Sequence, residues 1–341
     1  MSVTIAEIAK KVGTSTATIS RALNGLPGVS TELRAKILHA AKEMDYLPNI
    51  SARSLITKKT KIAAFVVEAK HANSADPFYP SILQGIQAEL AKNSYHVILV
   101  GHNNEEENGQ VWKIAREQKA DGFIFAGPDI NVATILAIKE AGYPVVLVDN
   151  SLPGTKISSI SIDNLGGAFE VVEHLIEHGH KKIAFLGGAS GWASTRERLD
   201  GYETALRQNG IDPSLKPLFM PATTIETGYS GMISILGGEA RPTAVFAVND
   251  AMAIGAMKAI HEAGLQVPED IAVAGFDDVI WSAYSDPPLT TASVFKEKLG
   301  NQAGHHFLEL IESPDEPPVK IEVSTQLVIR RSCGCRGDRS S

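Results

Sequence analysis

Short hydrogen-bonding side chains gather on one face of a helix expected close to the N-terminus, within TIAEIAKKVGTSTATISRALN at residues 4–24. At helical spacing Ile19, Ala22 and Leu23 form an apolar stripe. The opposite face carries short or small side chains and one arginine: Thr16, Ala17, Ser20, Arg21 and Asn24. Short side chains let a helix lie close to another surface, and an arginine can donate two bonds to a guanine edge. The pattern predicts a helix that enters the major groove of DNA.

The flanking residues predict a helix-turn-helix unit around this face. An earlier helix has apolar residues at i, i+3, i+4 and i+7: Ile5, Ile8, Ala9 and Val12. Gly13 is suited to end that helix, and the Ser15 hydroxyl can cap the next one. A third helix is expected from Ser30 to about Met44.

Charge is divided unevenly along the 341 residues. The whole chain has a net charge of −7, yet residues 1–61 hold ten Lys and Arg against four Asp and Glu, a balance of +6. The other 280 residues therefore carry −13. A basic N-terminal region on an acidic body confines the attraction for phosphate to one end. This length suffices for two or three domains.

The stretch YLPNISARSLITKKTK, residues 46–61, differs from the helices before it. Pro48 interrupts a helix, Asn49 is a good N-cap, and residues 50–56 are long enough for two helical turns. Helices this short are marginal in water on their own. We expect this segment to order when it meets a partner.

From residue 62 onward apolar strand-like runs alternate with amphipathic helices. The expected strands are 62–67, 96–101, 122–127, 144–150, 159–163, 182–188, 244–250 and 271–278. The clearest helices between them are 80–92, 165–178, 197–208 and 251–263. Continuous apolar strands that alternate with helices are typical of parallel sheets covered on both faces. Two sets of such strands predict two α/β lobes.

Polar pairs end three of the expected strands: Asp149-Asn150, Asn249-Asp250 and Asp277-Asp278. In open α/β sheets ligands bind beyond the carboxyl ends of the strands. Carboxylates and amides around a cleft suit the vicinal hydroxyls of a sugar-like molecule. The alternative for each pair is simple capping of the next helix. Three pairs at equivalent places favour a ligand site.

Other features limit the classes of protein that fit. No apolar run has membrane-spanning length, and the N-terminus turns charged within ten residues, so no membrane partner, no secretory signal and a cytoplasmic location are expected. His174 and His178 lie one helical turn apart, where a metal site and a solvated helix end are the alternatives. Cys333 and Cys335 fall on an expected polar tail; they provide only two thiolates and no disulfide framework. We expect no metal and no cofactor.

The chain resembles the LacI/GalR (lactose-repressor) family of bacterial transcriptional regulators. The resemblance extends over nearly its whole length, from the N-terminal stretch through YLPNISARSL to VNDAMAIGAM, GFDD and PPLTT. It implies an all-α helix-turn-helix headpiece followed by an α/β periplasmic-binding-protein-like core of two doubly wound parallel-sheet lobes. It also implies a homodimeric repressor that binds a pseudo-palindromic operator in double-stranded DNA and responds to a small effector: a sugar, sugar derivative, polyol or nucleoside.

Residues of this sequence that match the family's motifs become candidate contacts. The DNA candidates are Thr4, Ser15, Thr16, Ala17, Thr18, Ser20, Arg21, Asn24, Asn49, Ala52 and Leu55. Among them Leu55 matches a minor-groove wedge, although it could also be a packing residue. The effector candidates are Phe78, Tyr79, Asp149, Trp192, Arg198, Asn249 and Asp277. Thr223 falls where some relatives place an aromatic lid, so Trp192 or Trp281 is expected to supply the ring instead.

The same resemblance implies a division of the chain. Residues 1–47 are expected to form the headpiece, 48–60 a hinge helix and linker, 61–332 the core and 333–341 the polar tail. Lobe 1 is expected to contain 61–161 plus 292–321, and lobe 2 162–291 plus 322–332.

Two other classes remain as alternatives. A solute-binding protein shares a two-lobed core, but it needs an export signal and no DNA-binding head. An enzyme needs catalytic residues, and the sequence lacks a phosphate-binding Gly-Lys-Ser/Thr loop and a Gly-x-Ser-x-Gly motif. Residues 293–296 spell Ser-x-x-Lys, a match that is common by chance. We therefore expect a regulator with no catalytic residues.

Overall fold

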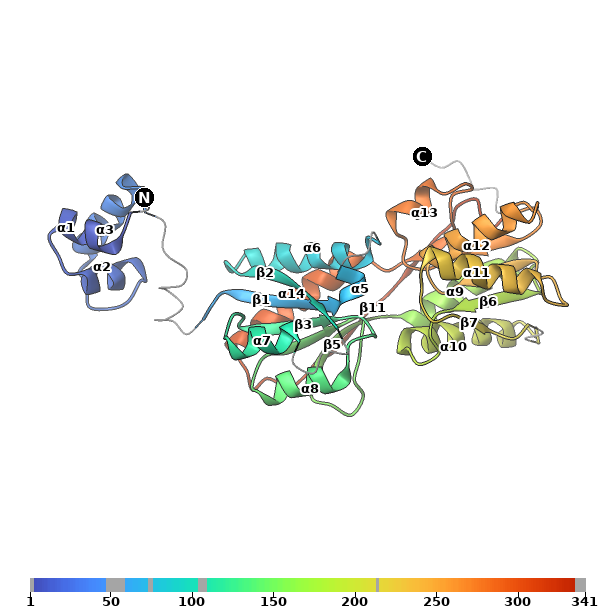
Figure 1. Cartoon of the computed structure of the whole chain (residues 1–341), viewed down its shortest axis with the longest axis horizontal. Coiled ribbons are helices and arrows are strands. Elements are labelled where there is room, and N and C mark those ends of the chain that lie inside the picture. The colour runs from blue at the N-terminus through green and yellow to red at the C-terminus, as the bar shows by residue number, and fades with distance from the viewer. Residues whose placement is uncertain (1–2, 47–58, 73–75, 104–108, 213–214, 335–341) are drawn as a thin grey trace. The chain divides into compact units, whose positions relative to one another are not determined.

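The computed structural model describes residues 3–46, 59–72, 76–103, 109–212 and 215–334 (Figure 1). The chain forms two compact units, Met1–Lys61 and Ile62–Ser341. The predicted hinge contacts Asn49, Ala52 and Leu55 lie outside the described residues, as does Cys335. Within the described ranges, the helices are all too short or too polar to cross a membrane.

Three helices form the first unit: α1 (Ile5–Val12), α2 (Thr16–Leu23) and α3 (Thr31–Glu43). Thr4 and Glu7 cap α1 reciprocally, and Gly13 ends it in the left-handed conformation with φ 78°. Ser15 accepts a hydrogen bond from the Thr18 N–H at 3.1 Å and so begins α2. One apolar side chain from each helix is fully buried at the centre: Ile8, Ile19 and Ile37.

Six parallel strands form the sheet of lobe 1, in the order β11-β5-β4-β3-β1-β2. Their bounds are β1 Ile62–Glu68, β2 His96–His102, β3 Gly122–Ala126, β4 Val145–Val148, β5 Ser158–Ile162 and β11 Lys320–Val323. Helices α6 (Phe78–Ala91) and α14 (Lys296–Glu312) cover one face, and α7 (Gln110–Arg116) and α8 (Val132–Glu140) cover the other (Figure 1). The short helix α5 (Ala69–Ala72) follows β1 directly.

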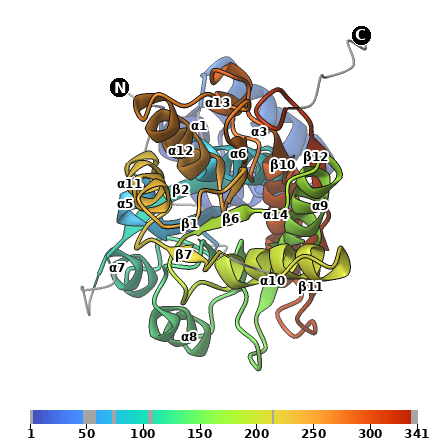
Figure 2. The same ribbon diagram turned by 90° about the vertical axis from the view of Figure 1, so that its right-hand side faces the viewer.

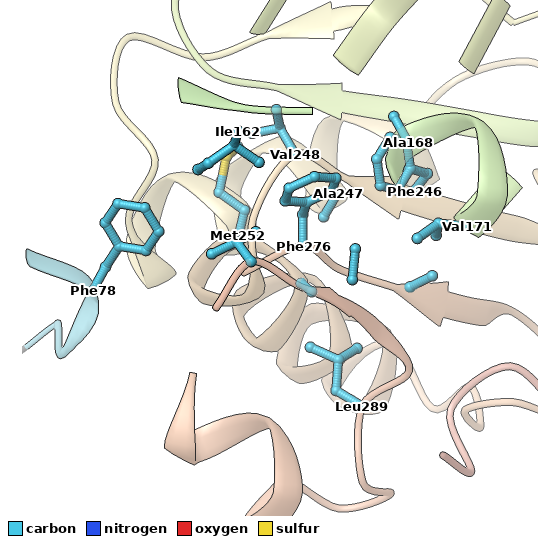
Figure 3. Close-up of a cluster of buried hydrophobic side chains, with 14 of the residues drawn as sticks. Phe78, Ile162, Ala168, Val171, Phe246, Ala247, Val248, Met252, Phe276 and Leu289 are labelled. Atoms are coloured by element: carbon cyan, nitrogen blue, oxygen red, sulfur yellow. The ribbon is translucent and has the colours of Figure 1, made fainter. Parts of the chain in front are cut away.

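Lobe 2 repeats this design around four parallel strands in the order β7-β6-β8-β9. The strands are β6 Ile183–Gly187, β7 Leu218–Phe219, β8 Ala244–Ala247 and β9 Ala272–Ala274. Helices α9 (Asn164–Glu177) and α10 (Ala193–Gln208) pack together on one face, with α11 (Ile225–Leu236) and α12 (Asp250–Glu262) on the other (Figure 2). Figure 3 shows Phe246, Met252 and Phe276 in the buried cluster between these layers.

Three passages of the described chain connect the lobes. The chain leaves lobe 1 between β5 and α9, returns between β10 (Thr291–Ser293) and α14, and leaves again between β11 and β12 (Gln326–Val328). Strands β10 and β12 pair antiparallel. The C-terminal ends of both parallel sheets adjoin these passages, which places the strand ends of the two lobes around one space.

Two expectations about exposed residues are wrong. His174, expected on a solvated helix end, is buried because the last turn of α9 packs its inner side against the segment after β12. Cys333, expected on a polar tail, is buried in the same place. The chain continues to pack against lobe 2 as far as Cys333, so this residue belongs to the core.

Candidate functional site

A cavity of about 370 Å³ lies between the lobes, where the strand ends meet. Ligands of open α/β sheets bind at the carboxyl ends of strands, where the strand order reverses. That reversal falls between β1 and β3 in lobe 1 and between β6 and β8 in lobe 2. The lining follows this geometry, since His71 comes just after β1, Asp129 after β3 and Asn249 after β8.

The structure places all seven predicted effector residues in the lining of this cavity: Phe78, Tyr79, Asp149, Trp192, Arg198, Asn249 and Asp277. Further lining residues were not predicted, among them Lys70, His71, Asp76, Asp129, Thr195 and Glu226. Lys70 and His71 lie on α5, in a segment without a recognisable motif. Their position directly after the first strand is the one signal that could have found them.

Arg198 and Asp277 form the charged centre of the lobe 2 wall. The Arg198 Nη2 atom lies 3.3 Å from the Asp277 Oδ1 atom, and both residues are more than nine-tenths buried. Burial raises the pKa of Asp277 well above its ordinary value, although the charge of Arg198 acts in the opposite direction. This pair presents a fixed donor and an acceptor to anything in the cavity.

The guanidinium of Arg198 is held rigidly by its own lobe. Its Nε–H donates to Asn164 Oδ1 at 2.9 Å, and Nη1 donates to the Val248 carbonyl at 2.5 Å. The group lies 3.8 Å from the centroid of the Phe276 ring. With three sides already occupied, the position of the remaining N–H donors is fixed before a ligand arrives.

Asp149 and Tyr79 form the opposite polar pair, in lobe 1. The Tyr79 hydroxyl donates to Asp149 Oδ2 at 3.3 Å. Burial raises the pKa of Asp149 to about 6, opposed by the charge of Arg198 and the bond from Tyr79. Gly127, at φ 93°, gives the tyrosine hydroxyl its room, because a Cβ there would collide with that oxygen.

The three polar strand-end pairs divide between ligand cavity and framework. Asp149, Asn249 and Asp277 line the cavity, whereas their sequence neighbours bond to the protein itself. Asn150 donates to the Gly127 carbonyl at 2.9 Å, and Asp278 pairs with Arg330 at 2.6 Å. Asp250 is fully buried and accepts bonds from three groups: Val279 N–H, Ser282 Oγ–H and Thr291 Oγ1–H. One member of each pair therefore faces the cavity and the other supports the framework, since consecutive side chains diverge.

Asn249 combines the two roles that the sequence left as alternatives. Its Oδ1 accepts from the Met252 N–H at 3.0 Å and caps α12, while its Nδ2 donates to the Thr223 carbonyl at 3.1 Å. The same side chain also lines the cavity. Capping fixes the orientation of the Asn249 side chain, so capping a helix and lining the cavity do not exclude each other.

Backbone strain accompanies two of the ligand-facing acids. Asp149 has φ 52° and Asp277 has φ 105°, both in the left-handed half of conformational space that L-residues rarely adopt. Such conformations persist when the surrounding structure determines them, and they gather at binding sites. Here the turn after the strand aims each carboxylate into the cavity.

An ionic network forms the lobe 1 rim. Lys70 Nζ lies 2.5 Å from Glu68 Oε2 and 3.0 Å from Asp129 Oδ2, and His71 Nε2 lies 2.9 Å from the same Asp129 oxygen. Although burial acts to raise the pKa of Asp129, the bonds from His71 and Lys70 keep it below its ordinary value. Glu68, His71 and Asp129 are close enough to share a metal ion, but the lysine ammonium already supplies the positive charge there.

Aromatic rings complete the lining. Trp192 and Trp281, both half-buried, reach the cavity from lobe 2, as does Thr223. Lys70 Nζ lies 5.5 Å from the centroid of the Trp192 ring and so contacts the other lobe across the cavity. Indole faces beside fixed hydrogen-bonding groups suit a ring that has apolar C–H faces and a polar edge.

In the headpiece the structure separates predicted DNA contacts that cap helices from those that do not. Thr4 and Ser15 cap α1 and α2, and the Asn24 Nδ2 donates to the Ser20 carbonyl at the end of α2. The remaining predicted residues of α2 that are exposed are Thr16, Ala17 and Arg21. Thr18 and Ser20 are half-buried beside them. The exposed face of α2 therefore carries short side chains and one arginine.

Comparisons with known proteins agree with both parts of the chain. Residues 4–49 match the profile "Bacterial regulatory proteins, lacI family", and residues 172–333 match "Periplasmic binding protein-like domain". The chain is 32% identical over 331 residues to the probable HTH-type transcriptional repressor ExuR of Bacillus subtilis (strain 168), covering 97% of this chain and 98% of that protein.

Solved structures extend the similarity to three dimensions. The lac repressor dimer bound to operator and the anti-inducer ONPF matches with a TM-score of 0.83 at 28% identity, covering 98% of this chain and 99% of that one. A complex of the transcriptional regulator CelR with cellobiose matches with a TM-score of 0.74 at 29% identity, covering 97% and 99%. The protein with the helix-turn-helix head and the two-lobed core thus belongs to the lacI family of bacterial regulatory proteins and is a DNA-binding transcriptional regulator with an effector-binding core.

Proposed function

We propose that the protein is a homodimeric repressor whose effector is an uncharged sugar or polyol of mono- or disaccharide size, bound in the cavity between the lobes. The observation that carries this proposal is the Arg198–Asp277 pair in lobe 2, together with Asp149 of lobe 1 in the lining of the same cavity. Guanidinium N–H groups donate to hydroxyl oxygens, and carboxylates accept from hydroxyl hydrogens. Vicinal hydroxyls can satisfy both at once.

The charge of the cavity favours an uncharged ligand. Three cationic or potentially cationic side chains line it, Lys70, His71 and Arg198, against five acids: Asp76, Asp129, Asp149, Asp277 and Glu226. Each of the three already has an acidic partner. A phosphate or carboxylate on the ligand would have to displace one of these acidic partners.

Size and lining support the same class. A volume of about 370 Å³ lies in the lower part of the range typical of small-molecule sites. The indoles of Trp192 and Trp281 offer flat faces for sugar C–H groups. The related CelR structure holds cellobiose, which supports a saccharide in this fold.

At the other end of the chain, α2 is proposed to read the major groove through Thr16, Ala17 and Arg21. The related lac repressor structure is an operator-bound dimer, and a two-fold protein requires a two-fold operator. We propose the division into headpiece 1–47, hinge 48–60 and core 61–332 on the same basis. The protein then acts in the cytoplasm, with the DNA, and performs no catalytic step.

Two measurements test this function together. The full chain is screened by thermal shift against neutral monosaccharides, disaccharides and polyols, with sugar phosphates, uronic acids and nucleosides alongside, because a ligand that binds the native state raises its stability. We expect stabilisation from a neutral compound, and a change in operator retardation on gels with the same compound. Stabilisation by phosphorylated or uronic compounds alone would overturn the assignment of the effector class.

A further inference from the structure

The turn after β9 carries an effector-site carboxylate on an unfavourable backbone. Asp277 has φ 105° and Asp278 has φ 51°, so two consecutive residues other than glycine lie in the left-handed half of conformational space. Such conformations persist only where the surrounding structure determines them. Since Asp277 lines the cavity, the groups that hold this turn decide where its carboxylate lies.

Contacts from lobe 2 hold part of the turn. The Asp277 N–H donates to the Ala292 carbonyl of β10 at 2.8 Å. The Asp278 carboxylate accepts a bond from Arg330 Nη2 at 2.6 Å, and Arg330 follows β12 in the same lobe. These two contacts engage one N–H group and one side chain. The two carbonyl oxygens of the turn are bound in a different way.

Both carbonyl oxygens accept hydrogen bonds from one ammonium group, which belongs to lobe 1. Lys296 Nζ donates to the Asp278 carbonyl oxygen at 2.9 Å and also to the Asp277 carbonyl oxygen. Lys296 is the first residue of α14, a helix that covers the lobe 1 sheet. Two carbonyl dipoles directed at one point repel each other, and a cation between them offsets that repulsion. Lys296 therefore stabilises the turn in the observed conformation.

The start of α14 departs from local sequence preferences. Its N-cap residue Phe295 has φ 48°, and it provides no side-chain bond to the helix. The first helical residue is Lys296, although positive charge is unfavourable at the N-terminal end of the helix dipole. Natural sequences break such local rules mainly at functional or strained sites. A contact outside its own helix, such as the one with the turn, explains why a lysine stands here.

Helix α14 is a rigid support for this lysine, because it contacts α6 backbone to backbone. A Cβ on Gly85 of α6 would lie 2.1 Å from the Glu297 carbonyl oxygen of α14, so only glycine fits at this crossing. Helix α6 begins with Phe78 and Tyr79, which line the cavity. The lysine and the lobe 1 wall of the cavity are therefore fixed relative to each other.

The charge of Lys296 reaches the cavity although the residue is not part of the lining. Burial raises the pKa of Asp277 well above its ordinary value, and Lys296 is among the charges that oppose this rise. Burial also raises the pKa of Asp76, another acid of the lining, and Lys296 opposes that rise as well. The lysine acts on a ligand through these acids rather than by direct contact.

We propose that Lys296 is a positioning residue of the effector site: from lobe 1 it holds the Asp277–Asp278 turn of lobe 2 in the conformation that directs the Asp277 carboxylate at a ligand hydroxyl. Its role rests on the proposed function above. Because the lysine and the turn belong to different lobes, the carboxylate is in place only while the lobes keep this arrangement. Opening of the lobes breaks both bonds, so effector binding and lobe closure stabilise each other.

Hydrogen exchange of the ligand-free full chain tests the hold on the turn. The amides of Asp277 and Val279 are both hydrogen-bonded, so their exchange reports opening of the turn. Lys296→Met keeps the length of the side chain and removes its donors and charge. Peptides that contain residues 277–279 should exchange about 10- to 100-fold faster in this variant, since bonds to charged groups contribute that much. Peptides from β8 should exchange as before.

Two further variants complete the series. The matched control is Lys298→Met, which changes an exposed lysine two positions later on the same helix and should leave the exchange unchanged. Lys296→Arg should restore slow exchange, because a guanidinium can also donate to two carbonyl oxygens. Circular dichroism establishes that each variant is folded. Lys296→Gln, which removes the charge alone, replaces the methionine variant if that variant does not fold.

Affinity for small molecules tests the consequence for the effector site. Each variant is titrated by calorimetry with the compound that gives the unaltered chain its largest thermal shift, chosen from the saccharides, polyols, sugar phosphates, uronic acids and nucleosides of the screen above. Lys296→Met should bind that compound about 10- to 100-fold more weakly. Lys298→Met should bind it as the unaltered chain does, and Lys296→Arg within a few-fold of that affinity.

Three results would overturn the role of Lys296. They are unchanged exchange at residues 277–279 in Lys296→Met, faster exchange there without loss of affinity, and losses that Lys296→Arg does not restore. The proposed effector class can fail separately. If only charged compounds shift the unaltered chain, that class is wrong while the titration with a charged compound still decides the role of Lys296. If no compound of the screen shifts it, hydrogen exchange decides that role alone.

Discussion

The Nη2 atom of Arg198 lies 3.3 Å from Oδ1 of Asp277, and no described residue donates a hydrogen bond to that carboxylate oxygen. Charge-assisted bonds between such groups usually measure about 2.7–2.9 Å. Arg198 is held instead by Asn164 and Val248, which keep it from closing on the acid. The carboxylate oxygen therefore keeps the capacity to accept a bond from a ligand hydroxyl.

Replacement of this arginine should remove the effector response. Arg198→Ala takes away donors that are fixed in position and leaves Asp277 buried without its counter-ion, so effector affinity should fall by about 10- to 100-fold or more. Calorimetric titration with the effector found by screening measures the loss. Without effector, the variant should bind operator DNA as the unaltered protein does.

The matched control for that variant lies two residues earlier on the same helix. Arg196 is exposed and donates to the Ser190 and Gly191 carbonyls, outside the cavity lining. Arg196→Ala should bind effector as the unaltered protein does. Equal losses in the two variants would mean that the cavity is not the effector site.

The stability of the ligand-free core should depend on Asp149 between about pH 4 and pH 6. Its pKa is about 6 in the folded chain against an ordinary 3.8, so the folded state favours the protonated acid. Stability from this group is therefore full below about pH 4, declines as the pH rises, and reaches its minimum above pH 6. Between these two pH values the free energy of unfolding falls by at most about 3 kcal/mol on account of this group.

Asp149→Asn should abolish that part of the decline, because an amide stays neutral. Urea unfolding at pH 4.5 and at pH 7.5 measures it through tryptophan fluorescence, because Trp112, Trp192 and Trp281 all lie in the second unit, residues 62–341. Asp250, whose pKa is also about 6, is present in both proteins and contributes equally. An identical decline in the variant would show that Asp149 is not the titrating group.

Sequence preference on DNA should depend on Arg21. This exposed side chain of α2 can donate two bonds to guanine O6 and N7, which is worth about 1–3 kcal/mol of discrimination. Arg21→Ala should bind operator and scrambled DNA with nearly equal affinity in fluorescence anisotropy. In contrast, Lys61→Ala should weaken binding to operator and to scrambled DNA alike and should reduce the salt dependence of that binding. An unchanged ranking of operator variants by Arg21→Ala would refute the assigned readout.

Self-association should come from the core and not from the headpiece. A single headpiece of three short helices buries too little surface for tight specific binding, so two copies must be held at the half-site spacing. Sedimentation should give a dimer or larger both for the full chain and for a fragment that lacks residues 1–60. A monomeric fragment at micromolar concentration contradicts this expectation.

Most of the fold could be predicted because apolar runs and helical periodicity are strong signals in it. The runs expected at 62–67 and 182–188 are buried strands, with ends that differ from β1 and β6 by one residue at most. Strand β7 and helix α13 (Ile280–Tyr284) were not predicted, since two and five residues carry no measurable periodicity. Their place is set by contacts from other parts of the chain.

The polar pairs alone predicted the site at the level of the strand end, and the choice of side chain within each pair came from the family resemblance. A polar pair after a strand indicates where a ligand binds, yet Asp277 faces the cavity while Asp278 pairs with Arg330. The backbone angle at each residue decides this, and no pattern of residue types encodes it. The ionic rim escaped prediction for a related reason, because Lys70 and Asp129 are 59 positions apart.

The left-handed backbone at Asp149 and Asp277 bears on how this protein can evolve. Such conformations cost about 1–3 kcal/mol each for residues other than glycine, so substitution by glycine or asparagine relaxes the chain at both positions. Substitutions that stabilise the core at these positions therefore also remove the two carboxylates. Descendants that are no longer under selection for effector binding are expected to lose these acids early. They would become more stable proteins that no longer respond to the effector.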